Sequence, residues 1–344
     1  MPGHKYKGYT NDGRPLKISF DVDGDDTPPR QVEPHTTMPQ DGPVSNIAGK
    51  GLRFISFSSG SSGNCAYLGT PRGGILIDAG IREPVKYHRK NKNPERQDVP
   101  TFDQALAELE RNGISPDMIK GVLLTHAHQD HMRTLYPAVS RCKCSVYCTM
   151  GVMSQLLQRC RISSRIQDHH VPIFKEIPFR VMDMEITAFE TLHDVKSVGF
   201  SIEYGGERFV VATDMGIITE RAAHYMSRAN YLMIESNYDR EMLLNGTYSY
   251  MLKDRVMGEK GHLDNAVAAQ FVAEHYHKGL RYVFLCHLSN DNNTKEIALD
   301  TMRRAIESKG LSVGDGSNSA DQNTRDIQIC ALPRYTSSDF YILA

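Results

Sequence analysis

The run Thr125-His126-Ala127-His128-Gln129-Asp130-His131 places four side chains that can bind a metal ion within six positions. Zinc-like ions take imidazoles and carboxylates, with three protein ligands and an open water position at catalytic sites. His126 and His128 lie two residues apart behind an apolar segment, so both rings can face one side of an extended chain. Asp130 and His131 fall on the turn that follows. The run therefore predicts a metal site rather than a solvated polar loop.

More candidate ligands stand where other apolar segments end. His193, Asp214 and His287 each follow such a segment. One such residue alone is usually a cap or a surface group, but their shared position favours a common site. A carboxylate such as Asp214 can bridge two cations about 3.5–4 Å apart, and their shared water becomes a hydroxide nucleophile near neutral pH. Asp78, also at the end of an apolar segment, is a candidate to fix the tautomer of a histidine ligand.

The elements that must position these residues are short apolar runs between glycine turns, a pattern typical of sheet strands. Strands are expected at 52–57, 65–68, 74–77, 119–124, 145–148, 179–181, 185–189, 198–204, 209–213, 231–235, 282–286 and 327–332. Helices are expected at 102–111, at 265–277 with Asp264 as its cap, and at 294–309. Runs of strands with interspersed helices predict an α/β layered domain with its site along one sheet rim.

Composition places few limits on the partner. The chain has 344 residues, and 40 Lys and Arg against 41 Asp and Glu give a net charge of −1. A nucleic-acid binder would therefore concentrate its basic residues locally. No stretch approaches the ~20 apolar residues of a membrane span, and residues 1–50 lack the apolar core of a signal peptide. We expect a cytoplasmic location, a flexible leader over 1–50 and one folded domain over 51–344.

The seven cysteines are an odd number, which predicts reduced thiols in a chain without a secretion signal. Cys142, Cys144 and Cys148 are close enough in sequence for a structural zinc site. However, no C-x-x-C pair supports such a site, and residues 145–148 read as a strand. Small buried or surface thiols are the preferred interpretation.

The H-x-H-x-D-H run, together with His193, Asp214 and His287, resembles the metallo-β-lactamase fold from about Leu52 to the C-terminus. Longer segments are similar to the YycJ/WalJ branch of that fold, namely 58–64, 77–80, 212–216, 235–239 and 286–293. The resemblance implies an αββα four-layer sandwich, so that residues 51–344 form a metallo-β-lactamase-fold hydrolase domain.

The resemblance also implies a site with two divalent cations, Zn²⁺ or Mn²⁺. The implied ligands are His126, His128 and His193 for one cation and Asp130, His131 and His287 for the other, with Asp214 between them. Members of the branch are 5′-to-3′ exonuclease-like phosphodiesterases, so the implied partner is nucleic acid, DNA rather than RNA. This sequence departs from the branch at two places: Gln129 replaces a small hydroxyl residue, and the basic segment 86–96 is not part of the pattern. Neither departure affects a proposed ligand, but loops decide the substrate.

Glu235, and His262 within Gly261-His262-Leu263-Asp264-Asn265, resemble the arrangement in tRNase Z-type nucleases, where a Glu and a His form a pair near the leaving group. Glu235 and His262 are therefore expected to be catalytic together with Asp130. Glu235 would orient His262, which would protonate the departing 3′ oxygen or stabilise the phosphate as imidazolium. The alternative is that His262 only belongs to the cap at the start of a helix and takes no part in the reaction.

Several surface residues are candidates for contacts with nucleic acid, and ordinary solvated surface is the alternative for each. The basic candidates are the segment 86–96, Arg159, Arg161, Arg165, Lys253, Arg255 and Lys260. Tyr248 and Tyr250 offer stacking faces for bases. The small-residue loop 58–64 is either a phosphate-approaching loop or a tight turn beside the metals.

Two other function classes remain open. One is hydrolysis of a small ester, lactone or thioester on the same metal pair, and the other is a metal-stabilised scaffold without turnover. The Glu235–His262 pair favours the nuclease, because small-ester hydrolases need less help for the leaving group. A decayed site usually lacks ligands, whereas all seven proposed metal-site positions hold metal-competent residues.

Overall fold

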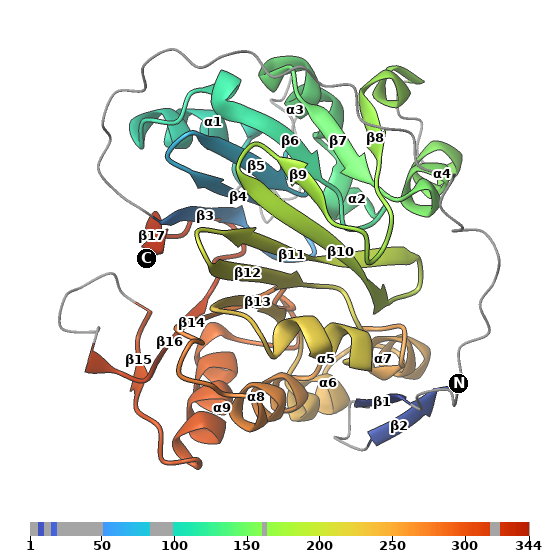
Figure 1. The fold of residues 1–344 in the computed structure, drawn as a ribbon. Coiled ribbons are helices and arrows are strands. Elements are labelled where there is room, and N and C mark those ends of the chain that lie inside the picture. Colours follow the sequence, from blue (N-terminus) through green and yellow to red (C-terminus); the bar gives the residue numbers. More distant parts are fainter. Residues whose placement is uncertain are drawn as a thin grey trace, which may run out of the picture.

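A computed structural model describes residues 6–9, 15–18, 51–82, 99–159, 164–316 and 324–343. Two mixed β-sheets face each other, and helices cover the outer face of each sheet (Figure 1). The expected α/β class and the αββα sandwich are therefore confirmed. Among the described helices, none combines the length and hydropathy that crossing a membrane requires.

The first sheet has the strand order β17-β3-β4-β5-β6-β7-β8. Its strands are β3 (Leu52–Ser58), β4 (Cys65–Thr70), β5 (Gly73–Ile77), β6 (Ile119–Leu123), β7 (Ser145–Cys148), β8 (His170–Pro172) and β17 (Tyr341–Leu343). From β5 to β8 the strands are parallel, so their carboxyl ends meet at one edge. The outer face packs against α1 (Phe102–Arg111), α3 (Leu135–Cys142) and α4 (Met150–Arg159).

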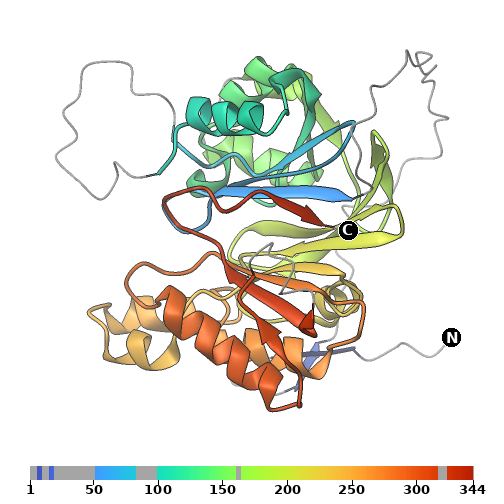
Figure 2. The same cartoon turned by 90° about the vertical axis from the view of Figure 1, so that its left-hand side faces the viewer.

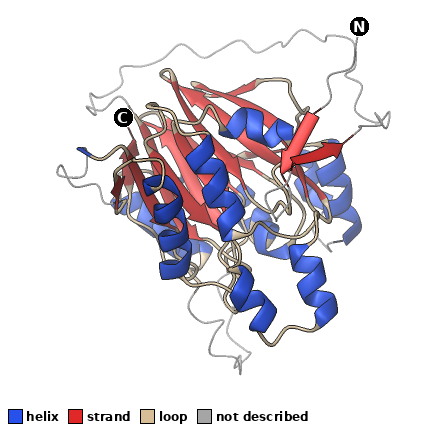
Figure 3. Cartoon of the chain, turned by 90° about the horizontal axis from the view of Figure 1, so that it is seen from below, coloured by secondary structure: helices blue, strands red, loops and turns tan. Residues whose placement is uncertain are grey.

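The second sheet has the order β15-β16-β14-β13-β12-β11-β10-β9. Its strands are β9 (Phe179–Val181), β10 (Met184–Leu192), β11 (Lys196–Tyr204), β12 (Glu207–Ala212), β13 (Tyr231–Glu235), β14 (Tyr282–Cys286), β15 (Val313–Gly314) and β16 (Ile327–Ala331). Helices α5 (Glu220–Met226), α8 (Asn265–Glu274) and α9 (Lys295–Glu307) cover its outer face, as Figure 3 shows from below.

Between the sheets lies a core of buried apolar side chains from both inner faces. Phe54 of β3 meets Phe209 of β12 and Phe284 of β14, with ring centroids 4.9 and 4.7 Å apart. Burying one such side chain stabilises the fold by about 1.5–3 kcal/mol. This core fixes the two sheets against each other and thereby brings their strand ends together.

The sequence predicted α1, α8 and α9, whereas the other described helices were not predicted. They are η2 (Pro116–Met118), α2 (Gln129–Met132), α3, α4, η3 (Ser164–His169), α5, α6 (Arg240–Asn245) and α7 (Tyr250–Met257). Figure 2 shows the orange segment of α6 and α7 projecting at the edge of the sandwich. The helix expected at 265–277 ends at Glu274, although Asp264 caps it by accepting from the Ala266 N–H.

Two predictions concern residues that lie largely outside the described ranges. The basic segment 86–96 is not described. Within the expected leader over 1–50, only β1 (Tyr6–Tyr9) and β2 (Pro15–Ile18) are described, as an antiparallel pair. The division into a leader and a hydrolase domain over 51–344 stays a prediction.

A backbone crossing at Gly80 holds the histidine run in place. The Ala79 N–H donates to the His131 carbonyl at 2.7 Å, and the Asn64 N–H donates to the Asp130 carbonyl at 2.7 Å. A Cβ on Gly80 would overlap the Asp130 carbonyl oxygen. This position therefore needs glycine for close approach of two backbones.

We expect Gly80→Ala to lower the free energy of unfolding by about 1–3 kcal/mol, because the overlap with Asp130 forces the backbones apart. Denaturant unfolding followed by circular dichroism measures the change. Gly151→Ala in α4 is the matched control, since its new Cβ meets Lys196 Cγ at an ordinary 3.6 Å. An unchanged unfolding midpoint for Gly80→Ala would contradict the proposed constraint.

Candidate active site

The polar residues singled out in the sequence gather where strands of both sheets end. Those that follow or end a strand are Asp78 after β5, His126 after β6, His193 after β10, Asp214 after β12, Glu235 at the end of β13 and His287 after β14. Three of them, Asp78, Asp214 and His287, have left-handed backbone angles with φ of 58°, 51° and 53°. Such non-glycine conformations cost about 1–3 kcal/mol each and persist where the surroundings impose them.

One group of imidazoles consists of His126, His128 and His193, whose candidate ligand atoms lie within 4.8 Å of one another. His126 Nε2 lies 3.1 Å from His128 Nδ1. His193 Nδ1 donates to the Gly261 carbonyl at 3.1 Å, which leaves Nε2 with its lone pair. That buried Nε2 makes no hydrogen bond, although a carboxylate oxygen of Asp194 lies 3.4 Å away. Each of the three rings therefore brings one nitrogen to a common site.

A second group consists of Asp130, His131 and His287, again with candidate ligand atoms within 4.8 Å. His287 Nε2 is buried without a hydrogen bond and lies 3.5 Å from Asp130 Oδ2. Asp214 lies between the two groups. Its Oδ2 is 3.3 Å from His131 Nε2, and its Oδ1 is 4.0 Å from His193 Nε2.

His131 is fixed from behind by a buried carboxylate. Its Nδ1 donates to Asp78 Oδ2 at 2.7 Å, so Nε2 faces the second group. Asp78 is itself held by the N–H and hydroxyl of Thr125 at 2.8 Å. Burial lowers the pKa of His131, but the carboxylates of Asp214, Asp78 and Asp130 outweigh it and raise the pKa to about 9. Asp78 thus occupies the orienting position that its place in the sequence predicted.

The donor set fits divalent cations. Burial acts to raise the pKa of Asp214, yet the surrounding histidines, His287 first, hold it well below its usual range. Burial lowers the pKa of His126 and His128, which keeps these imidazoles neutral as metal binding requires. Buried carboxylates beside imidazoles, with the unpartnered Nε2 atoms of His193 and His287, form an arrangement that a cation would satisfy.

Glu235 and His262 form the pair that the sequence predicted. His262 Nδ1 donates to Glu235 Oε1 at 2.8 Å, and His287 Nδ1 lies 3.0 Å from the same oxygen. The other carboxylate oxygen accepts the N–H groups of Met215 and Leu263 at 2.8 and 3.3 Å. Glu235 is completely buried, whereas a quarter of the His262 side chain is exposed. His262 therefore faces the solvent side of the site with a fixed ring orientation.

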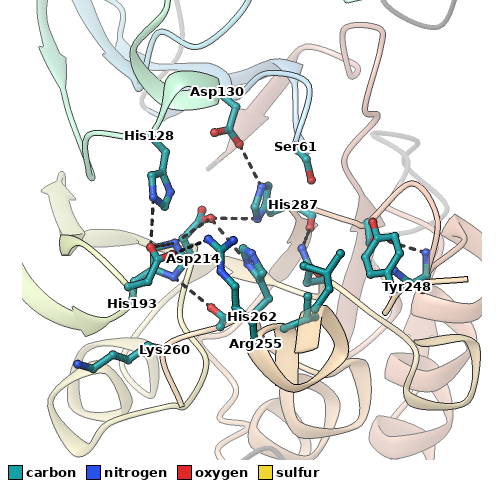
Figure 4. Close-up of a pocket in the computed structure, with 17 residues that line it drawn as sticks. Ser61, His128, Asp130, His193, Asp214, Tyr248, Arg255, Lys260, His262 and His287 are labelled. Atoms are coloured by element: carbon teal, nitrogen blue, oxygen red, sulfur yellow. Dashed lines mark hydrogen bonds and ion pairs between the residues drawn. The ribbon is translucent and has the colours of Figure 1, made fainter. Parts of the chain in front are cut away.

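These groups open onto a pocket of about 350 Å³ (Figure 4). The lining residues are Ser61, His128, Asp130, His193, Asp194, Asp214, Asn237, Tyr248, Leu252, Arg255, Val256, Lys260, Gly261, His262, His287, Ser289 and Asn292. Among the basic candidates from the sequence, Arg255 and Lys260 reach this pocket. Arg255 also pairs with Asp194 at 2.7 Å, and Asp194 in turn lies 3.2 Å from His128 Nε2.

The remaining candidates lie elsewhere. Lys253 Nζ donates to the Leu244 carbonyl at 2.6 Å, and Arg165 contacts the Tyr136 hydroxyl. Tyr250 is 83% exposed and does not line the pocket. Residue 161 and the side chain at 159 lie outside what the structure describes. Within the described residues, no group that could hold a metal includes a cysteine, which agrees with buried thiols.

Two residues near the site escaped the sequence analysis. The Asn64 amide donates to His131 Nε2 at 2.9 Å and to Asp130 Oδ2 at 3.3 Å. The loop 58–64 that carries Asn64 uses its N–H groups at 59, 60, 63 and 64 internally or on neighbouring carbonyls, which favours the tight-turn interpretation. Arg334 donates to the Leu288 carbonyl at 2.9 Å and so fixes the loop after His287. Arg334 has no motif that would have revealed it, whereas Asn64 lies in the segment 58–64 that resembles the YycJ/WalJ branch.

Comparison with known proteins identifies a family, two relatives by sequence and a solved structure with the same fold. The family model described as beta-lactamase superfamily domain matches residues 74–287. "Exodeoxyribonuclease YycJ" of Bacillus anthracis is 30% identical over 275 residues, covering 77% of this chain and 93% of that protein. "Exodeoxyribonuclease WalJ" of Streptococcus pneumoniae is 27% identical, covering 77% and 91%. The metallo-beta-lactamase fold protein YhfI from Bacillus subtilis shares the fold, with TM-score 0.54, 13% identity and coverage of 84% and 99%.

We expect Asp78→Asn to weaken Zn²⁺ binding by about 10- to 100-fold, because the amide no longer holds His131 Nδ1 as a fixed donor. Competition against a chromophoric chelator measures this affinity. Asp300→Asn on the exposed side of α9, where Asp300 pairs with Arg304 at 2.8 Å, is the control and should bind Zn²⁺ as the wild type does. Equal affinities for all three proteins would show that Asp78 does not orient a ligand.

Proposed function

Because the chain belongs to the metallo-β-lactamase-fold branch of the beta-lactamase superfamily, and is thus a metal-dependent hydrolase, we propose that it is a phosphodiesterase that degrades DNA from a 5′ end. The observation that carries the proposal is the Glu235–His262 pair, 2.8 Å apart, at the pocket that contains the histidine and aspartate cluster. The relatives named exodeoxyribonucleases support the choice of DNA as the substrate.

In this proposal the two clusters hold two divalent cations, Zn²⁺ or Mn²⁺. The proposed ligands are His126, His128 and His193 for one, Asp130, His131 and His287 for the other, and Asp214 for both. When bound, two such cations activate a water as the nucleophile and neutralise charge that develops on the phosphoryl oxygens. Asp130 lies at the pocket surface and accepts a proton from the attacking water.

His262 assists the leaving group. Its Nδ1 donates to Glu235, which fixes the ring at the pocket wall. Glu235 is completely buried and holds the ring by this hydrogen bond, and in the proposed reaction His262 donates a proton to the departing 3′ oxygen. Glu235 is in this scheme a positioning residue, because it acts through His262. Arg255 and Lys260 supply positive charge for the phosphate backbone at the pocket wall.

With added Zn²⁺ or Mn²⁺, we expect 5′-labelled single-stranded DNA to lose its label first as a mononucleotide, while 3′-labelled DNA shortens progressively. Denaturing gel electrophoresis resolves the two patterns. Asp130→Ala should reduce the rate by more than about 10-fold, because one ligand group and the proton acceptor are lost together. If lactones are opened rapidly while DNA and RNA stay intact with both metals, the small-ester alternative is correct.

The role of His262 is tested by changing the leaving group. His262→Ala should lose about 100- to 10,000-fold in kcat on DNA, but far less on a nucleoside 5′-(p-nitrophenyl) phosphate, whose leaving group departs without a proton. Glu235→Gln should show the same selective loss. His224→Ala on α5, outside the pocket, is the control. Equal losses on both substrates would assign His262 a structural role.

A further inference from the structure

Two segments singled out in the sequence are only partly explained by the proposed catalysis. The segments 235–239 and 286–293 supply Glu235 and His287, but they also contain buried amide and hydroxyl side chains. The most deeply buried of these, each at most 4% exposed, are Ser236, Asn237, Asn292 and Asn293. Polar side chains are buried where they have hydrogen-bond partners. The partners of these residues therefore indicate what the two segments do.

The backbone of His287 is held on both sides by side chains. Its N–H donates to the Ser59 hydroxyl at 2.9 Å, and its carbonyl accepts from the Asn237 amide at 2.7 Å. Ser59 follows β3 of the first sheet, and Asn237 follows β13 of the second. His287 has a left-handed backbone with φ of 53°, which is uncommon for a residue other than glycine and needs support from its surroundings. The two hydrogen bonds supply that support.

Asn237 also joins the backbone segments on either side of it. Its N–H donates to the Leu263 carbonyl at 2.9 Å, in the turn that carries His262. Its carbonyl accepts from the Ser289 N–H at 2.7 Å, in the loop after β14. Asn237 thus fixes the loop after β14 and the turn before α8 relative to the end of β13.

A buried network of amides holds Asn237 from behind. The Asn293 amide donates to the Asn237 carbonyl at 3.0 Å and to the Ser236 carbonyl at 2.9 Å. The Asn293 oxygen accepts from the Asn265 amide at 2.9 Å, and the Ser236 hydroxyl donates to the Asn265 oxygen at 2.6 Å. Asn237 lines the pocket, whereas Ser236, Asn265 and Asn293 do not. The network therefore acts on the site through the backbone that it holds.

We propose that Asn237 is a positioning residue for His287, and that together with Ser59 it keeps this imidazole in place as a ligand of the second cation. The inference rests on the ligand set of the proposed function, but not on the choice of substrate. Asp78 orients His131 through a ring nitrogen. Asn237 and Ser59 act instead on the backbone of the ligand residue, and loss of either lets the ring move away from Asp130 and Glu235.

The test is Zn²⁺ binding by the metal-free protein in competition with a chromophoric chelator. We expect Asn237→Ala to weaken binding at one of the two sites by about 10- to 100-fold, the range for residues that orient a ligand from outside the coordination sphere. The other site should keep its affinity, because His126, His128 and His193 do not depend on this contact. Ser59→Ala should act in the same direction, since it removes the acceptor of the His287 N–H.

Asn230→Ala is the matched control. Asn230 directly precedes β13, whereas Asn237 follows it, and the Asn230 amide likewise donates to a backbone carbonyl, that of Gly279, at 3.0 Å. This variant should lose stability in denaturant unfolding but bind Zn²⁺ at both sites as the wild type does. If it weakens Zn²⁺ binding as much as Asn237→Ala does, the loss is a general effect of stability and the assignment is wrong.

A double-mutant cycle separates positioning from a general effect on structure. If Asn237 acts through His287, Asn237→Ala has no further effect on Zn²⁺ affinity once His287→Ala has removed the ring. Additive losses in the double variant overturn the inference, as does wild-type Zn²⁺ binding by both Asn237→Ala and Ser59→Ala. Wild-type Zn²⁺ binding by His287→Ala alone overturns the proposed ligand set itself. Should Asn237→Ala fail to fold, Ser59→Ala takes its place in the cycle.

Discussion

The buried carboxylate of Asp214 is the group on which the arrangement of the site depends. It is 1% exposed and lies where the two sheets meet. His131, which follows the strands of the first sheet, approaches one oxygen to 3.3 Å, and His287 of the second sheet approaches the other to 3.2 Å. An isolated carboxylate at this depth would cost several kcal/mol. The histidines around it are therefore both the condition for burying this charge and the proposed means of binding cations.

This constraint explains why strain collects at the strand ends. Asp78, Asp214 and His287 each follow a strand in a left-handed backbone conformation. The cost is offset by the apolar core between the sheets and by buried hydrogen bonds such as that from the His287 N–H to the Ser59 hydroxyl at 2.9 Å. A rigid sandwich can hold such conformations, whereas a loop without a core behind it would relax.

The sequence alone predicted the features that form a repeating or closely spaced pattern of residues. Apolar runs located most strands, and the short spacing from His126 to His131 indicated the metal site. Helix α4 has apolar residues at helical spacing and was not predicted, and α7 has no buried residue and was not predicted either. The close approach at Gly80 could not be predicted, because it depends on two backbones that are distant in sequence and meet only in the fold.

The chemistry and the choice of substrate rest on different parts of the chain. The candidate ligands and Glu235 stand at the ends of strands of the packed sheets or in the segments that follow them, so their positions depend on the core. Tyr248, Arg255 and Lys260 come instead from α7 and its flanking turns at the edge of the sandwich, where α7 buries no side chain. Changes in such a segment cost little stability. The same cluster can therefore serve different substrates in different members of the fold, and under the proposed function the residues around α7 would contribute to the choice of substrate.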